Sequence, residues 1–91
     1  MQMKKEVYKY KVETKGTTVL SVPAPIRMLY VGMQGSSTYV WIECIPEQES
    51  TPVVINGVGT GCEAPIEDAY IGTVLNGQFV WHYYRATYES Q

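Results

Sequence analysis

Short runs of alternating or β-branched residues, separated by turn-forming residues, fill this sequence from one end to the other. They recur at roughly the 8- to 12-residue spacing of β-sandwiches and small barrels. No stretch sustains the 3.6-residue period of an amphipathic helix. The sequence therefore predicts an all-β fold, a small antiparallel β-sandwich or barrel of about six to seven short strands with at most one short helical turn. Its 91 residues suit a single domain over 1–91, in which 1–4 and 87–91 are frayed.

The first strand is predicted over Glu6–Glu13, where from Tyr8 onward apolar or aromatic residues alternate strictly with charged ones. This alternation is typical of a half-buried strand whose other face, with Lys9 and Lys11, is solvated. The lysines fit an edge strand protected from aggregation, which we favour, or an edge that attracts phosphates and acids. Residues 15–16 then form a turn, and the β-branched Thr17–Val22 returns as a hairpin partner.

Further elements are expected after the prolines at positions 23 and 25, which interrupt strand pairing. Ile26–Met33 carries apolar residues on both faces, which predicts a central strand. Thr38–Ile45 is the most clearly predicted strand of the chain, because small or aliphatic side chains alternate with larger ones: Val40, Ile42 and Cys44 against Tyr39, Trp41 and Glu43. Pro52–Ile55 is predicted as a short strand, and Ala64–Asp68 as the one helical turn.

A hairpin is predicted near the C-terminus, around an Asn-Gly pair at positions 76–77. Apolar runs over Tyr70–Leu75 and Gln78–Ala86 flank this pair. Asn-Gly tolerates the positive φ angles of a type I′ turn, the tightest connection between antiparallel strands. The sequence therefore predicts a type I′ turn there.

A glycine-rich stretch at 56–62 is predicted to form a turn. Glycines let a backbone adopt positive φ or approach another group closely. No helix start follows, so the stretch fits neither a P-loop nor a dinucleotide-binding turn. Two interpretations stay open: a bulged corner between sheets, which we favour, and a nest of N–H groups that binds an anion. In the second case Gly59, Thr60 and Gly61 would bind the ligand.

Aromatic residues provide the second group of candidate ligand-binding residues. Eight Tyr and two Trp stand against one Phe, which favours some exposed aromatic surface because a purely apolar core needs no hydroxyl groups. In the C-terminal strand, Trp81, Tyr83 and Arg85 share one face, and they could either stack on a flat base or fill the core. Arg27 and Tyr39 complete the predicted ligand-binding set, with the arginines available for phosphate or cation–π contacts.

Catalytic and metal-dependent functions are disfavoured by the residues present. His82 is the sole histidine, and a lone histidine in an aromatic strand is more often a hydrogen-bonded structural residue than a general base. Cys44 and Cys62 lack the spacing of a zinc site, and Cys62 is expected to be a buried free thiol rather than a reactive one. We therefore expect no enzyme, no cofactor and no bound metal.

Charge and hydropathy narrow the partners and the compartment. A net charge of −2 argues against broad nucleic-acid binding and against binding to anionic membranes. The N-terminal residues are charged rather than apolar, so neither a signal peptide nor a transmembrane segment is predicted. A cytoplasmic protein with reduced thiols is the expectation.

Three motifs carry a family resemblance: Gly59-Thr60-Gly61, Tyr70-Ile71-Gly72-Thr73-Val74 and Val80-Trp81-His82. Together with weaker similarity over most of the chain, they resemble a family of small proteins that are encoded mainly by bacteriophages and prophages and catalogued as a domain of unknown function. This chain has Cys62 where the family often has a histidine, and Ile45-Pro46 where the family has an acid–proline pair. The first departure argues against a histidine acting beside the glycine stretch.

The resemblance implies a phage setting and, with the β fold and the aromatic excess, a function. We expect a phage accessory protein, in the cytoplasm of an infected bacterium, that antagonises host defence by non-catalytic binding. The expected partner is a small nucleotide-type immune signal, sequestered by a homo-oligomer with pockets at subunit interfaces. The alternatives are an inhibitor that binds a host defence protein, as anti-CRISPR proteins do, and a structural or assembly protein of the virion.

Overall fold

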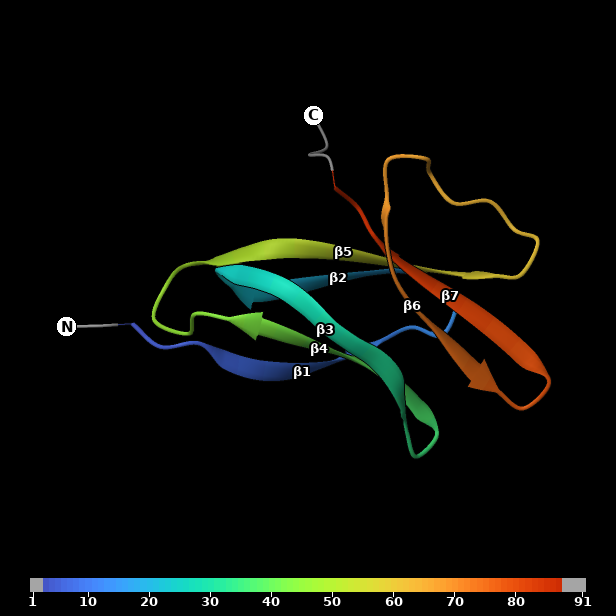
Figure 1. The fold of residues 1–91 in the computed structure, drawn as a ribbon, viewed down its shortest axis with the longest axis horizontal. Coiled ribbons are helices and arrows are strands. Elements are labelled where there is room, and N and C mark those ends of the chain that lie inside the picture. The colour runs from blue at the N-terminus through green and yellow to red at the C-terminus, as the bar shows by residue number, and fades with distance from the viewer. Residues whose placement is uncertain (1–2, 88–91) are drawn as a thin grey trace.

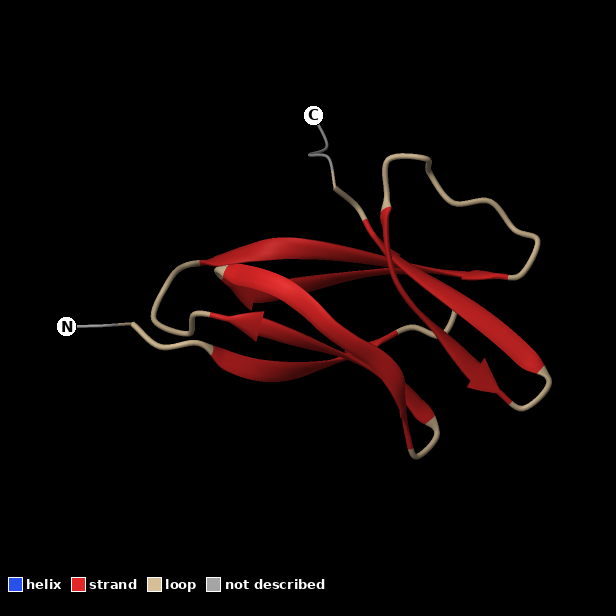
Figure 2. Cartoon of the chain, viewed as in Figure 1, coloured by secondary structure: helices blue, strands red, loops and turns tan. Residues whose placement is uncertain are grey.

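Two antiparallel sheets account for the regular structure of residues 3–87, the part of the chain that the computed structural model describes (Figures 1 and 2). Those residues form no helix, and the all-β prediction is confirmed. The seven strands found there are β1 (Glu6–Val12), β2 (Gly16–Pro23), β3 (Pro25–Gln34), β4 (Ser37–Cys44), β5 (Ser50–Gly59), β6 (Ala69–Asn76) and β7 (Phe79–Arg85). The first sheet has the order β1-β4-β3, and the second the order β2-β5-β7-β6.

The core lies between the inner faces of the two sheets. β4, at the centre of the first sheet, contributes Val40, Ile42 and Cys44, all completely buried. Their positions confirm the alternation predicted for this strand, since successive side chains point to opposite faces. The remaining buried apolar side chains are Val12, Val22, Val31, Val53, Ile55, Val74 and Tyr83.

β1 is an edge strand, as its alternating lysines predicted. Lys9 and Lys11 are exposed, whereas Val12 belongs to the core. The predicted hairpin between β1 and β2 is wrong, however, because β1 pairs with β4 and β2 pairs with β5. Gly16, the first residue of β2, has a φ of 95°, a backbone conformation that glycine tolerates at the start of the strand.

β3 is also an edge strand, and its predicted central position is wrong. Its pairing with β4 is irregular between Pro25 and Arg27 and again between Met28 and Tyr30. Each irregularity leaves one extra residue unpaired, as in a β-bulge. The unpaired residues are Ile26 and Leu29, and both are exposed. They are among the apolar residues from which two buried faces were predicted.

The glycine-rich stretch is mostly strand, so the predicted corner is wrong for Asn56–Gly59. β5 continues to Gly59 and pairs with β2 on one side and β7 on the other. Close packing requires glycine at position 57, because a Cβ atom there would lie 2.8 Å from the Thr14 carbonyl oxygen and 2.8 Å from the Tyr83 ring. Within residues 56–62, Gly61 alone has a positive φ, 89°. It lies in a turn in which the Cys62 N–H donates to the Gly59 carbonyl at 3.0 Å.

The β6–β7 hairpin is confirmed, but its turn differs from the prediction. Asn76 pairs with Phe79, so the two loop residues are Gly77 and Gln78. Only the first has a positive φ, 64°, which is the pattern of a type II′ turn rather than type I′. The pair at 76–77 thus marks the hairpin, while the glycine takes the first loop position and Asn76 stays in the strand.

The loop between β5 and β6 contains no helical turn. Instead, the Asp68 N–H donates to the Pro65 carbonyl across a single tight turn, at 3.1 Å. The segment is too short to offset the cost of nucleating a helix. At its far end, Thr87 Oγ1 donates to the Glu67 carbonyl. The predicted fraying of residues 1–2 and 88–91 lies outside the described residues.

Candidate functional site

The predicted ligand-binding residues do not form one site. Gly59 pairs with Trp81, and a Cβ atom at Gly59 would lie 3.4 Å from the Trp81 ring. Thr60 and Gly61 follow directly in the turn after β5. These four residues lie together at one end of the second sheet, where Trp81 is half-buried and stacks on Phe79 at 6.2 Å between ring centroids.

Tyr83 faces the core, so its predicted role in ligand binding is wrong for this structure. Its side chain is 0% exposed, and its hydroxyl donates to the Thr14 carbonyl at 2.8 Å. Burial raises the pKa of the Tyr83 phenol. Arg85 lies near the opposite end of β7, between Ile55 and Ala69, and is separated from Trp81 by the buried tyrosine.

His82 lies on the outer face of the second sheet and is hydrogen-bonded at both ring nitrogens. Its Nε2 lies 2.8 Å from Thr60 Oγ1, and its Nδ1 lies 3.0 Å from Thr73 Oγ1. The Thr73 hydroxyl also lies 2.5 Å from the Tyr70 hydroxyl. Hydroxyl groups both donate and accept, so they satisfy either tautomer of the imidazole. This network ties the turn after β5 to β7 and β6, in agreement with the structural role expected for His82.

Tyr39 lies in a row of three aromatic side chains on the outer face of the first sheet. Trp41 is at its centre, 6.2 Å from Tyr39 and 5.7 Å from Tyr30 between ring centroids. Tyr30 is 64% exposed, and the other two rings are half-buried. We call Tyr30, Trp41 and Tyr39 the aromatic platform.

Cationic side chains border the aromatic platform on both sides. On β1, Lys9 Nζ lies 4.7 Å above the centre of the Tyr39 ring and donates to Gln34 Oε1 at 2.7 Å. On β3, Arg27 Nε donates to Glu43 Oε1 at 3.2 Å. Glu43 is the only acidic residue in the sequence of β4. The platform therefore combines partly exposed ring surface with positive charge at its borders.

The predicted set omitted two of the platform's three rings, Tyr30 and Trp41, and the bordering Lys9. Trp41 was missed although Thr38–Ile45 places it on the same face as Tyr39. The opposite face of that strand could have indicated its exposure: small and aliphatic side chains there point into the core, so the rings point outward. Tyr30 could not be placed from the alternation, because a bulge shifts it into register with Trp41.

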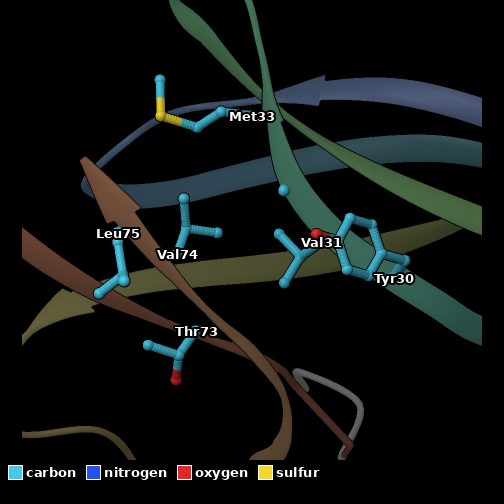
Figure 3. A pocket seen from close by; sticks show the side chains of 7 residues that line it. Tyr30, Val31, Met33, Thr73, Val74 and Leu75 are labelled. Carbon is cyan, nitrogen blue, oxygen red and sulfur yellow. The ribbon is translucent and has the colours of Figure 1, made fainter.

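A groove lies between the facing edge strands of the two sheets, β3 and β6, and Tyr30 borders it. Its volume is about 300 Å³, and its lining includes Val31 and Met33 of β3 and residues 73–75 of β6. Val31 and Val74 point toward each other across the gap, as Figure 3 shows. Gly72 is needed nearby, since a Cβ atom there would lie 2.3 Å from Val31 Cγ1.

The two cysteines have different environments. Cys44 is buried, and burial raises the pKa of its thiol. Cys62 is exposed, so the expectation of a buried thiol is wrong at that position. In the part of the chain that the structure describes, no three His, Cys, Asp or Glu side chains lie close enough to hold a metal ion.

The fold and the site together define a small two-sheet β protein whose first sheet presents partly exposed rings between cationic side chains. The chain belongs to a family described as a domain of unknown function, DUF7352, which matches residues 3–91. The predicted membership in a family of unknown function is thereby confirmed. No curated protein and no solved structure matches the chain. Residues 3–87 contain no helix of the length and apolar character needed to span a membrane.

Proposed function

We propose that this protein binds a small nucleotide-type ligand on the aromatic platform and performs no chemistry on it. The observation that carries the proposal is the row of rings on the outer face of the first sheet. Tyr30, Trp41 and Tyr39 lie at centroid spacings of 5.7 and 6.2 Å, and none is fully buried. A β-sheet face with such rings suits stacking against flat bases.

The charge distribution favours an anionic ligand over a neutral aromatic one. Lys9, Lys11 and Arg27 point from the strands on either side of β4, and all three are exposed. They suit phosphate groups, with the base held between the rings. Stacking on an aromatic side chain contributes about 1–3 kcal/mol per base, so the rings would supply much of the affinity and the cations would add salt dependence.

The biological setting that we propose is the sequestration of a nucleotide-type immune signal by a phage accessory protein, in the cytoplasm of an infected bacterium. The resemblance of residues 59–61, 70–74 and 80–82 to phage and prophage proteins supports this setting. Binding without turnover is supported by His82, whose two ring nitrogens are both engaged by threonine hydroxyls. A homo-oligomer would raise the number of ligands held by each particle.

Calorimetry with a defined set of nucleotides tests the proposal. The set comprises adenine and guanine mononucleotides, cyclic dinucleotides and a dinucleotide cofactor such as NAD. We expect saturable heat with at least one of them, and intact ligand in the supernatant after the protein is denatured. An altered product would contradict binding without chemistry. No heat with any nucleotide, together with co-purification of a host protein, would favour the protein-inhibitor alternative.

Two alanine variants localise the binding. Tyr30→Ala removes an exposed ring of the platform and should weaken binding at least about tenfold, the equivalent of 1.4 kcal/mol. Phe79→Ala removes a similarly exposed ring from the second sheet and should leave the affinity unchanged. Equal losses in both variants, or a loss only in Phe79→Ala, would place the ligand elsewhere.

A further inference from the structure

The edge of β2 is unprotected, unlike the other three sheet edges. Within residues 3–87, β5 is the one strand paired with β2, and this pairing runs from Gly16 to Pro23 without a bulge. Two further contacts come from neighbouring loops: the Ile45 N–H donates to the Pro23 carbonyl, and the Glu13 N–H donates to Thr18 Oγ1. The strand, GTTVLSVP, contains no charged residue. Val19 is 65% exposed on its outer face. A regular, uncharged edge strand is a template for pairing with another chain.

The other edges carry the devices that prevent such pairing. β1 has Lys9 and Lys11 in its second half, and both are exposed. β3 is interrupted by two irregularities and lies against β6 across the groove, where Val31 packs beside Gly72. β6 has an irregularity of its own, between Tyr70 and Gly72. β2 has neither lysines nor a bulge, and proline appears only at its last residue.

We propose that a second copy of this chain pairs with β2, antiparallel and about a two-fold axis, to join the two four-stranded sheets into one. A symmetric contact brings the same surface together from both subunits, so it must not oppose like charges. β2 meets this condition because it has no charge to oppose. β1 would instead place its lysines near their own copies. A β1–β2 contact would be head-to-tail, and it would build a ring or an open filament rather than a two-fold dimer.

The alternation of the strand restricts the register. Residues that oppose each other in an antiparallel pair point to the same face, so the two-fold axis must pass through a residue. We place it at Val19, so that Val19 opposes Val19 of the partner subunit and Thr17 opposes the partner subunit's Ser21. This register buries the most exposed apolar side chain of β2 and leaves Pro23 beyond the paired residues.

The open side of β2 also accounts for the partial exposure of Leu20, an inward-facing residue in the middle of the strand. Leu20 is half-buried, whereas Val53, opposite it on β5, is buried. A strand added beside β2 would cover Leu20 in the same way that β2 covers Val53. The aromatic platform lies on the other sheet, so the proposed dimer leaves both ligand sites accessible and does not depend on the ligand.

Cysteine cross-linking tests the register. In a Cys62→Ser background, Val19→Cys should form an intermolecular disulfide, because directly opposed residues have Cβ atoms about 4.5–5.5 Å apart. Ser21→Cys is the matched control on the same edge and face. In the proposed register its copies lie four residues apart along the strand, about 14 Å, which is too far for a disulfide. No cross-link in Val19→Cys, or an equal cross-link in Ser21→Cys, would overturn the pairing.

Light scattering on the intact chain tests the assembly itself. We expect a mass of twice 10.3 kDa for the unaltered protein. Val19→Lys should have half that value, because the proposed register would place the new lysine opposite its own copy. Val7→Lys makes the same change at an exposed position on the edge strand of the other sheet and should remain dimeric. A monomeric unaltered protein, or a Val19→Lys variant that stays dimeric, would overturn the proposal.

Discussion

β4 and β7 both combine tryptophan with tyrosine in alternating positions, yet their rings point in opposite directions. In β4, Tyr39 and Trp41 lie on the outer face of the first sheet. In β7, Tyr83 is completely buried and Trp81 packs against the core. Similar rings therefore form a surface in one sheet and fill the interior in the other.

The residues between the rings decide which face of each strand is buried. In β4, three of the four residues on the alternate face are Val40, Ile42 and Cys44, which are largely apolar and favour burial; the fourth is Thr38. In β7, the alternate face carries His82, whose imidazole needs hydrogen-bond partners. In β4, the aliphatic face is buried and the rings therefore lie on the outer face of the sheet. In β7, the rings form the more apolar face of the strand and therefore point to the core.

The largest expected effect comes from removing the buried ring. Tyr83→Ala should lower the free energy of unfolding by about 3–5 kcal/mol, as for other large-to-small substitutions of aromatic core residues. Tyr30→Ala, at an exposed ring of the platform, should change it by less than about 0.5 kcal/mol. Urea denaturation of both variants checks the contrast. Similar losses in the two variants would contradict the assignment of core and surface.

A smaller effect is expected from the glycine that accommodates the Tyr83 ring. Gly57→Ala places a methyl group against a backbone oxygen and that ring, so we expect a loss of about 1–3 kcal/mol. Gly59→Ala is the matched control, because its new methyl group would make ordinary contacts with Trp81. Thermal or urea unfolding measures both. A neutral Gly57→Ala would show that close packing does not require this glycine.

The Tyr83 hydroxyl should have the smallest effect, and the effect depends on pH. Tyr83→Phe removes the hydrogen bond to Thr14 and should cost about 1 kcal/mol at neutral pH. Burial raises the pKa of Tyr83 above its ordinary value of 10.0. The unfolded chain therefore loses this proton first, and the stability that Tyr83 provides is complete below pH 10 and lost as pH rises through the folded pKa.

Unfolding measurements across the alkaline range check this sign. The difference in stability between the unaltered protein and Tyr83→Phe should narrow above pH 10. Tyr10 and Cys44 also have raised pKa values owing to burial, so the variant should keep part of the alkaline loss. A difference that widens with pH would contradict a buried neutral phenol.

Local sequence patterns predicted most of the strands. The predictions failed where the structure depends on contacts between residues that are distant in the sequence. The alternation in β4 and the turn residues before β7 depend on neighbouring residues alone. The placement of β1 and β2 in different sheets depends on which partner strand covers each apolar face, and no local pattern encodes this choice. The local pattern at Gly57 and Gly59 predicts a turn, because the Tyr83 ring that requires Gly57 lies 26 positions away in the sequence.

The candidate site was also predicted only in part. Tyr39 and Arg27 were predicted and lie at the platform, whereas Tyr83 was predicted and lies in the core. Period-2 alternation tells which residues share a face but not which face is exposed. The residues that alternate with the rings differ between β4 and β7, and comparing them would indicate that the rings of β4 are the exposed ones.

Fluorescence of the two tryptophans separately tests the central claim that β4, rather than β7, presents the ligand-binding rings. Trp81→Phe leaves Trp41 as the only tryptophan, and Trp41→Phe leaves Trp81. Each protein is titrated with the nucleotide that gives heat in calorimetry. We predict saturable quenching in the protein that retains Trp41 and none in the protein that retains Trp81. Quenching of Trp81 with an unaffected Trp41 would contradict the account.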